Sequence, residues 1–353
     1  MILFSPGPSN ISERVRQALL HPDIGHREPE FGALLREVTE GLRGAFSVPA
    51  EHAITLFGGS GSVGIESVVA AARGAGPLLV VSNGPYGQRA AAMAHHHGTA
   101  TQELRLDWGA AISPGAVERR LADDRAAVLY VVHHETATGR LNDLEALAAV
   151  AHRHGVMIAV DAVSSLGGEP LELAGWGLDA VIASGNKCLR GIPGVALVTA
   201  SPRFLRAAQG VPALHYASLH AHVTAQANGE FPFTPPVHAL FALREALAEL
   251  RDETVAARIA HYRALSDRLR AGLRTLGIEP VVPDWEAGHT IVCAPLPTGW
   301  DYARLHDALK AEGLVIYAAQ GGLAATHFRV GLIGHYGIEA VERLLGAMGR
   351  LLA

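Results

Sequence analysis

The stretch SGNKCLRGIPG, from Ser184 to Gly194, contains Lys187, which is one of only two lysines in the chain of 353 residues. Lysine and arginine together number 29, so 27 of these cations (29 minus 2) are arginines. A bias in genome base composition would explain why lysine is rare, but not why it is kept at two positions. A neutral lysine amine attacks a carbonyl carbon, whereas a guanidinium stays charged. We therefore interpret Lys187 as a reactive amine.

The flanks of this stretch alternate between short apolar runs and amphipathic helical patterns. Five runs have the length and the apolar composition of buried strands, namely 77–84, 126–135, 156–165, 178–187 and 194–200. Between the second and the third lies the amphipathic pattern LNDLEALAAVAHRHG, over 141–155, which ends at a glycine. Strands that alternate with helices and are apolar on both faces predict an α/β fold with a mostly parallel sheet covered by helices.

The C-terminal part of the chain has a different pattern. The segment after Gly210, which ends in FTPPV, is rich in His, Pro and polar residues and predicts irregular structure. Long helical patterns follow over 237–277, and the remainder alternates short strands and helices. We expect two domains, a large one over 1–245 that includes the N-terminal segment and a small α+β domain over 246–353.

Composition excludes several classes of protein. The formal net charge is −5 and charged residues make up 18%, without the basic excess of a nucleic-acid-binding protein. No apolar run approaches the ~20 residues of a membrane-spanning helix, and Pro6 and Pro8 come too early for a signal peptide. The two cysteines, Cys188 and Cys293, cannot build a disulfide framework. We therefore expect a soluble cytoplasmic protein.

In open α/β sheets, ligands bind outside the carboxyl ends of the strands. Three candidate groups have this position: one ends a predicted strand, one follows a predicted strand, and one opens a helix. Asp161 ends an otherwise apolar strand, as either a cap for the next segment or a site residue, and Lys187 follows the next strand. The segment GGSGSVGIESVVAAA, over 58–72, opens a helix whose N-terminus suits a phosphate. Together they match pyridoxal phosphate, which needs a phosphate cradle, a carboxylate facing its ring nitrogen and a lysine for its aldehyde. Lys310, near the end of a helical pattern, has the position of a surface residue.

Seven further segments, in their order along the chain, resemble those of one enzyme family. They are FSPGPSN (4–10), GSGS (59–62), SNGPYGQR (82–89), HHETATG (133–139), VDAVSSLGG (160–168), FTPPVHALFALREAL (233–247) and HFRVGLIG (327–334). Nearly from end to end, the chain resembles the class V aminotransferases of the fold-type I pyridoxal-phosphate enzymes. The resemblance implies a large domain with a mostly parallel seven-stranded sheet flanked by helices, a small C-terminal α+β domain, and a homodimer with shared active sites.

The resemblance also implies roles for individual residues in binding the cofactor. Lys187 would bond to the aldehyde and act as the catalytic residue, and Asp161 would pair with the pyridine nitrogen. Tyr86 would stack on the ring, and Thr136 would lie near the ring hydroxyl group. The phosphate would be bound by Ser60, Gly61, Ser62 and Ser184, with Thr234 reaching the phosphate of the neighbouring subunit.

Two arginines are candidates for binding the substrate. The resemblance implies that Arg329, in HFRVG, binds an acidic group of the substrate, by a bidentate contact if that group is a carboxylate. Without the resemblance, Arg329 would be read as one half of a surface ion pair, which its apolar neighbours Phe328 and Val330 disfavour. Arg27 is the second candidate for the same role.

The substrates follow from the branch of the family that the chain resembles most. The segments NKCLRGIPG, HHETATG and FTPPVH are most similar to enzymes that transfer the amino group of 2-aminoethylphosphonate to pyruvate. GHREPEFGALL (25–35) and YAAQGG (317–322) depart from that pattern, and VSSLGG, LREAL and RVGLIG lean toward the alanine:glyoxylate and serine:glyoxylate enzymes. We expect a small aminophosphonate as donor and a keto acid such as pyruvate as acceptor, with a glyoxylate-type aminotransferase as the alternative.

Other functions fit the sequence less well. A lyase on the same fold would use the same carbanion, so the residues do not exclude it. A cysteine desulfurase needs a mobile cysteine, whereas Cys188 adjoins the lysine and Cys293 lies in a predicted strand. A cofactor-binding regulatory or scaffold protein would not need an intact lysine, aspartate and phosphate segment. The histidines at 95–97 do not predict a metal site, because consecutive helical side chains face different directions, and His220 and His222 could approach one ligand only if their segment were extended.

Overall fold

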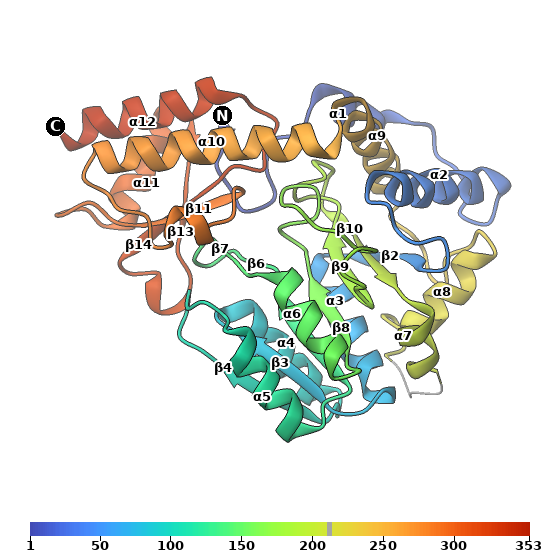
Figure 1. Ribbon diagram of the computed structural model, residues 1–353. Coiled ribbons are helices and arrows are strands. Elements are labelled where there is room, and N and C mark those ends of the chain that lie inside the picture. The colour runs from blue at the N-terminus through green and yellow to red at the C-terminus, as the bar shows by residue number, and fades with distance from the viewer. Residues whose placement is uncertain (210–213) are drawn as a thin grey trace.

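A seven-stranded sheet forms the centre of the protein, whose computed structural model describes residues 1–209 and 214–353 (Figure 1). In spatial order its strands are β2 (Ala53–Gly59), β10 (Gly194–Ala200), β9 (Ala180–Ser184), β8 (Met157–Asp161), β5 (Val128–Val132), β3 (Leu78–Ser82) and β4 (Thr101–Arg105). β10 is antiparallel to β2 and β9, and all other neighbours are parallel. The expected α/β fold with a mostly parallel sheet is therefore confirmed.

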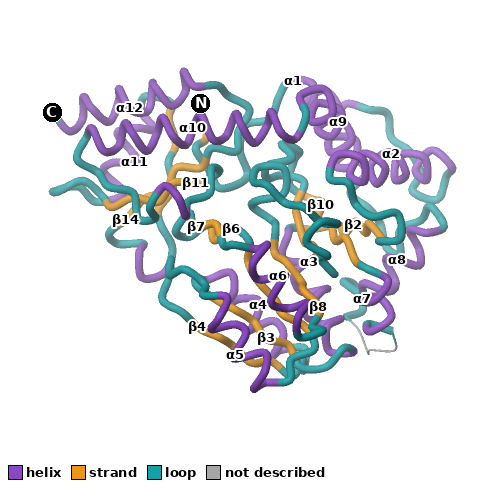
Figure 2. Tube along the Cα trace, viewed as in Figure 1, coloured by secondary structure: helices purple, strands orange, loops and turns teal. Residues whose placement is uncertain are grey.

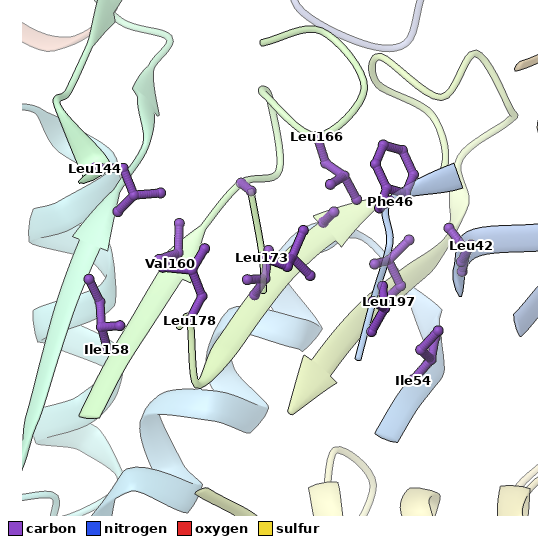
Figure 3. Close-up of a cluster of buried hydrophobic side chains, with 14 of the residues drawn as sticks. Leu42, Phe46, Ile54, Leu144, Ile158, Val160, Leu166, Leu173, Leu178 and Leu197 are labelled. Atoms are coloured by element: carbon purple, nitrogen blue, oxygen red, sulfur yellow. The ribbon is translucent and has the colours of Figure 1, made fainter. Parts of the chain in front are cut away.

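Helices cover both faces of this sheet, as its strands require because they are apolar on both sides. One face packs against α2 (Pro29–Ala45), α5 (Pro114–Asp124), α6 (Leu144–Arg153) and α9 (Val237–Glu253). The other packs against α3 (Gly61–Ala71), α4 (Pro85–His96), α7 (Pro202–Ala207) and α8 (Leu219–Ala227). Along β8, Ile158 and Val160 face the first layer (Figure 3), whereas Met157 and Ala159 face the second. The strand therefore reads as a continuous apolar run.

Helix α8 corrects the expectation of irregular structure after Gly210. The Ser218 side chain caps this helix by accepting a hydrogen bond of 3.2 Å from the Ala221 N–H. His222 is buried on it, with its ring centroid 4.3 Å from that of Phe57. His222 therefore lies with Leu219 on the buried face of the helix, whereas His215 and His220 are exposed. Within residues 1–209 and 214–353, no three His, Cys, Asp or Glu side chains gather as metal ligands.

The C-terminal part of the chain builds a second apolar core. It contains α10 (Val255–Thr275), α11 (Tyr302–Ala311) and α12 (Ile338–Leu352), and a three-stranded sheet of β11 (Ile291–Pro295), β14 (His327–Gly331) and β13 (Tyr317–Ala318). The N-terminal strand β1 (Ile2–Leu3) joins it by pairing in parallel with β12 (Leu314–Val315). α10 is long but rich in arginine, and no helix in the described ranges has the length and apolar character to cross a membrane.

A short hairpin connects the two cores. It consists of β6 (His134–Glu135) and β7 (Arg140–Leu141), and Figure 2 shows it between the large sheet and β11 and β14. The backbone of Arg140 forms an isolated antiparallel β-bridge with Ala287, and its side chain forms an ion pair of 2.8 Å with Glu286. The remaining helical elements are α1 (Glu13–Gln17) and the 3-10 turns Ala18–Leu20, Ala72–Gly74, Asp284–Glu286 and Gly321–Leu323. The division into 1–245 and 246–353 stays a prediction, and its boundary falls inside α9.

Candidate active site

The carboxyl ends of all strands of the large sheet except β10 lie at one edge, where open α/β folds bind ligands. β3, β5, β8 and β9 are parallel, and β2 shares their direction because β10 is antiparallel to both β2 and β9. A cavity of about 230 Å³ lies at this edge. Its lining includes Ser60, Gly61, Ser62, Tyr86, Thr136, Asp161, Ser184 and Lys187, all of which the sequence analysis singles out. A larger groove of about 800 Å³ along α2 and α9 contains none of the strand ends.

Lys187 lies in the loop between β9 and β10 and reaches into this cavity. Its Nζ donates a hydrogen bond of 2.7 Å to the carbonyl oxygen of Pro6. Burial lowers the pKa of the Lys187 ammonium below its ordinary value of 10.5, because the surroundings solvate the charged form poorly. A larger share of the amine is therefore neutral, and hence nucleophilic, near neutral pH.

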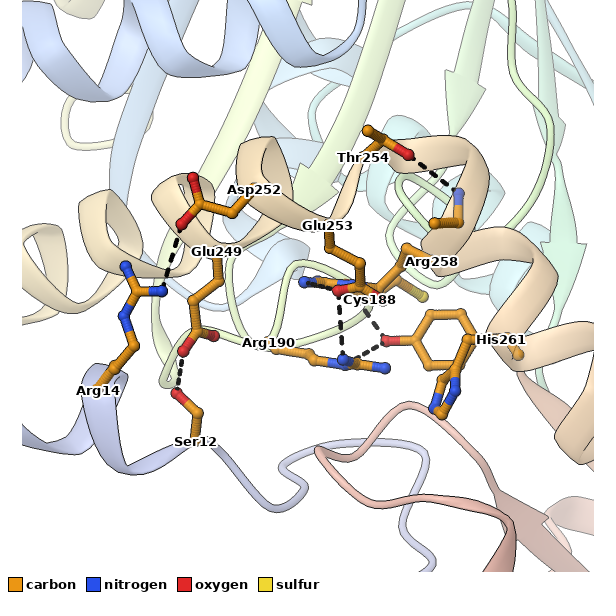
Figure 4. Close-up of polar contacts among 12 residues, drawn as sticks. Ser12, Arg14, Cys188, Arg190, Glu249, Asp252, Glu253, Thr254, Arg258 and His261 are labelled. Atoms are coloured by element: carbon orange, nitrogen blue, oxygen red, sulfur yellow. Dashed lines mark hydrogen bonds and ion pairs between the residues drawn. The ribbon is translucent and has the colours of Figure 1, made fainter.

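Side chains from α10 hold the lysine-bearing loop in place (Figure 4). Arg258 donates a hydrogen bond of 3.1 Å from Nη1 to the carbonyl oxygen of Cys188, and Arg190 donates one of 2.9 Å from Nε to the Tyr262 hydroxyl. The charge of Arg258, which is only 1% exposed, is balanced by Glu253 at 2.7 Å. Because a buried charge without its partner is costly, this ion pair stabilises the buried guanidinium that donates to the loop.

Asp161 is the last residue of β8 and lies on the floor of the cavity. Burial raises the pKa of its carboxyl group to about 6, although the Val163 N–H and the charges of Lys187 and Arg89 act against the rise. Oδ1 accepts the hydrogen bond from Val163 at 2.9 Å, and among the described residues no donor binds Oδ2. Beside Asp161, the buried Tyr130 hydroxyl has no partner at hydrogen-bond distance among the residues described, although it is close enough to the carboxylate to act against the rise in the pKa of Asp161. The floor therefore presents polar atoms that a ligand can bind.

Opposite the acidic floor, the N-terminus of α3 forms a cradle of hydrogen-bond donors. Ser60 is the N-cap residue, and its side chain makes no capping hydrogen bond. The backbone N–H groups of Gly61 and Ser62 belong to the first turn, where a helix has no internal acceptors for them. At the end of β9, the Ser184 hydroxyl donates a hydrogen bond of 2.7 Å to Oδ1 of Asn186. These groups suit a phosphate, which the helix dipole also favours.

Tyr86 forms one wall of the cavity from the first turn of α4. The guanidinium of Arg89, one turn further along, lies 4.9 Å from the centre of its ring. Nε2 of Gln320 donates a hydrogen bond of 3.3 Å to the Tyr86 hydroxyl. Gln320 belongs to the segment YAAQGG, so the segment that departs from the family pattern contacts the wall of the cavity.

Arg329 is buried on β14, and it does not line the cavity directly. Its Nε donates a hydrogen bond of 3.0 Å to the Ala318 carbonyl oxygen, and its Nη1 donates one of 3.2 Å to the Thr136 carbonyl oxygen. Within the described parts of the chain it has no ion pair, unlike a surface arginine. Its charge therefore lies one residue layer behind Thr136, which does line the cavity.

The structure does not bring Arg27 or Thr234 to the cavity of this single chain. Arg27 has 57% of its side chain exposed and forms an ion pair of 3.2 Å with Glu230. Thr234 is exposed in the connection between α8 and α9. Their roles stay predictions, and for Thr234 that role needs a second copy of the chain.

Sequence reasoning missed half of the cavity lining. The further residues are Gly7, Ile65, Arg89, Val132, His134, Val163, Ser164 and Asn186. Gly7, Arg89 and His134 lie within family segments, so those segments already contained the signal. Gly7 is the most informative, because a Cβ atom there would lie 2.6 Å from Nζ of Lys187.

Replacing this glycine tests how closely the N-terminal loop approaches the lysine. Gly7→Ala should weaken ligand binding and lower the rate, because the new methyl group overlaps Lys187 and because φ is +125°. We also expect a loss of about 1–3 kcal/mol in the free energy of unfolding from the backbone strain. Gly155→Ala is the matched control, since Gly155 has φ +67° but open space around it. A rate that falls equally in both variants would show that strain, not the contact, is responsible.

Comparison with known proteins agrees with this geometry. The model of the family "Aminotransferase class-V" matches residues 3–338. A 2-aminoethylphosphonate–pyruvate transaminase of Vibrio vulnificus is 35% identical over 99% of this chain and 97% of its own length. An alanine–glyoxylate aminotransferase from Nostoc sp. superposes with a TM-score of 0.93 at 28% identity, over 100% of this chain and 95% of that one. A pyridoxamine–pyruvate aminotransferase from Mesorhizobium loti gives 0.92 at 26%, over 99% and 92%.

The chain belongs to the class V aminotransferase family, over almost its whole length. It is an aminotransferase with the fold of that family, and the resemblance drawn from the sequence segments is confirmed.

Proposed function

We propose that this aminotransferase uses pyridoxal phosphate to move the amino group of 2-aminoethylphosphonate, or of a related small aminophosphonate, to a keto acid such as pyruvate. The observation that carries the proposal is the convergence of Lys187, Asp161 and the N-terminus of α3 on one cavity. The name of the Vibrio vulnificus relative supports the choice of donor and acceptor.

The residues of the cavity fit this cofactor. Asp161 offers a carboxylate oxygen that no described donor binds, Ser60 offers a hydroxyl group free of capping, and Tyr86 offers an aromatic face. Lys187 is the only lysine of the cavity, and Gly7 leaves room for its amine. Each chemical part of pyridoxal phosphate thus has a group of matching chemistry, which supports its assignment as the cofactor.

When bound, pyridoxal phosphate supplies a protonated ring that stabilises negative charge on the carbon next to the amine. The carboxylate of Asp161 would stabilise the positive charge of that ring by electrostatic attraction, since with a pKa of about 6 it is ionised at neutral pH. Lys187 would hold the aldehyde of the cofactor, and its amine, when free, would accept a proton from the substrate carbon. Because burial lowers the pKa of Lys187, the amine is well suited to accept and return that proton.

The substrate's acidic group needs a cation near the cavity. Arg329 is the better candidate, because it is buried behind Thr136 while Arg27 is paired with Glu230 on the surface. Nη1 and Nε of Arg329 each donate to a backbone carbonyl, which leaves Nη2 and the second Nη1 hydrogen for an anion.

One alternative donor class has specific support. The superposition on the Nostoc enzyme and the segments GHREPEFGALL and YAAQGG favour a glyoxylate-type aminotransferase. Cysteine desulfuration has no such support, because burial raises the pKa of Cys188 and of Cys293 to about 12 and both thiols stay protonated. A lyase remains open, and formation of product without any keto acid would identify it.

The same proposal includes a cytoplasmic homodimer with shared active sites. The exposed position of Thr234 leaves it available to a second copy, and both cysteines are free and buried, as a reducing compartment allows. The mass of the protein in solution tests the dimer.

A half-reaction on the cofactor-loaded protein tests the donor. 2-Aminoethylphosphonate, L-alanine and L-serine are added separately, without a keto acid, and the visible absorbance of the bound cofactor is followed. We expect the phosphonate to remove this absorbance at the lowest concentration and to yield phosphonoacetaldehyde. Loss of absorbance with alanine or serine alone would reject the aminophosphonate and select the glyoxylate branch.

A further inference from the structure

Glu135 is a buried carboxylate next to the cavity for which the steps above have no use. It is 0% exposed and ends the short strand β6, immediately before Thr136. Oε1 accepts a hydrogen bond of 3.1 Å from the Ala137 N–H, and Oε2 accepts one of 3.3 Å from the Tyr86 N–H. A single carboxyl group therefore joins the loop after β5 to the start of α4.

The N-terminus of α4 uses this carboxyl group as its cap. Gly84 is the N-cap residue of α4 and has no side chain to cap the helix, so Glu135 supplies the acceptor from another strand. A Cβ atom at Gly84 would overlap the Glu135 side chain. The glycine and the glutamate are therefore matched to each other.

The surroundings of Glu135 contain few compensating charges. No Lys, Arg or His within 4.0 Å forms an ion pair with it among the described residues. Arg329 attracts the carboxylate from β14 and Asp161 repels it from β8, and the Glu135 charge in turn helps to raise the pKa of the Tyr130 hydroxyl on β5. Burial raises the pKa of Glu135 to about 7, so the group changes charge close to neutral pH.

We infer that Glu135 is a positioning residue, whose carboxylate cross-links the first turn of α4, which carries Tyr86, to the hairpin of β6 and β7, which carries Thr136, and so sets the distance between the two walls of the cavity. It touches neither the reacting atoms nor the cavity surface, and it acts through the backbone of Tyr86 and Ala137. The consequence for catalysis rests on the proposed function, because Tyr86 is the residue assigned to the cofactor ring. The cross-link itself does not depend on that assignment.

Hydrogen exchange in the cofactor-free protein tests the cross-link. Glu135→Gln keeps the size of the side chain, but its amide NH₂ cannot accept, so one of the two N–H groups loses its acceptor. We expect the Tyr86 or the Ala137 amide to exchange at least about tenfold faster than in the unchanged protein. Gly84→Ala should act on the same contact from the other side and speed exchange at Tyr86, which keeps the test valid if Glu135→Gln does not fold.

Glu169→Gln is the matched control, since Glu169 is also buried and also accepts a backbone N–H, from His289 at 2.5 Å. It should leave exchange at Tyr86 and Ala137 unchanged. In the unchanged protein the affinity for pyridoxal phosphate should change with pH around 7, above the change that Asp161 produces around 6, and Glu135→Gln should remove only the upper inflection, which a purely structural role would not do. Unchanged exchange at both amides would overturn the inference, while the half-reaction above tests the proposed function separately.

Discussion

Lys187→Ala should abolish turnover, with a loss of at least about 10³-fold, because it removes both the nucleophilic amine and the general base. The fold should survive, since Arg258 holds the loop through the Cys188 carbonyl oxygen and not through the lysine. Steady-state transamination and circular dichroism measure the two properties. Appreciable turnover by a folded Lys187→Ala protein would reject the assignment of the site.

Lys310→Ala is the natural control, because it replaces the second of the two lysines of the chain. Lys310 is exposed in the last turn of α11, in agreement with the surface position expected from the sequence. Its removal should leave the rate within about twofold and cost at most about 1 kcal/mol through the lost helix-dipole interaction. A comparable loss of activity in both variants would point to a general effect of removing a cation.

Asp161→Asn is expected to have the second largest effect on activity. The amide has no charge to hold a protonated ring nitrogen, and loss of one such preorganised electrostatic partner costs about 10²–10³-fold in rate. Single-turnover rates with the preferred amine, compared with the affinity for pyridoxal phosphate, separate lost chemistry from lost binding. Equal rates for Asp161→Asn and the unchanged protein would place the charge partner elsewhere.

The same substitution should change how stability depends on pH. The pKa of Asp161 is about 6 in the folded protein against an ordinary value of 3.8, so the folded state binds more protons between these values. Its contribution to stability is therefore largest below pH 3.8 and is lost as the pH rises through 6. Relative to the unchanged cofactor-free protein, Asp161→Asn should gain up to about 3 kcal/mol between pH 4 and 7. Urea unfolding at several pH values measures this difference.

The sequence predicts the parts of the fold that have a strong pattern. The apolar runs at 156–165 and 178–187 contain β8 and β9, and the long helical pattern over 237–277 contains α9 and α10. These elements are apolar on the buried faces, so hydrophobic periodicity alone identifies them. Helix α8 was missed because one of its buried residues, His222, is a polar residue type. In the folded protein its ring packs against the ring of Phe57.

Strand β4 was not predicted either, for a related reason. It lies at the edge of the sheet, and its residues, TQELR, are half-buried or exposed. An edge strand needs no continuous apolar run, because solvent reaches one of its sides. Its position follows only from pairing with β3, which no local pattern reveals.

Within the site, the sequence predicts the groups whose chemistry is distinctive. Lys187 and Asp161 stand out because a lone lysine and a carboxylate at the end of an apolar strand are unusual. Gly7 and Gln320 lie in segments that the sequence analysis noted, FSPGPSN and YAAQGG, but their own chemistry does not single them out, since their importance lies in contacts with Lys187 and Tyr86 across long stretches of chain. Such contacts depend on how the two cores meet, which is a property of the folded molecule.

The pairing of β1 with β12 places a limit on when the enzyme can become active. Ile2 pairs with Leu314, 312 residues later (314 minus 2), so a ribosome that adds about 5–20 residues per second needs roughly 15–60 seconds to supply the partner. Until then the first residues of the nascent chain have no strand to pair with. The carbonyl oxygen of Pro6, which follows β1, is therefore not yet held in position to accept the hydrogen bond from Lys187. The N-terminal cover of the reactive amine is therefore assembled only after the strand at Leu314–Val315 has been made.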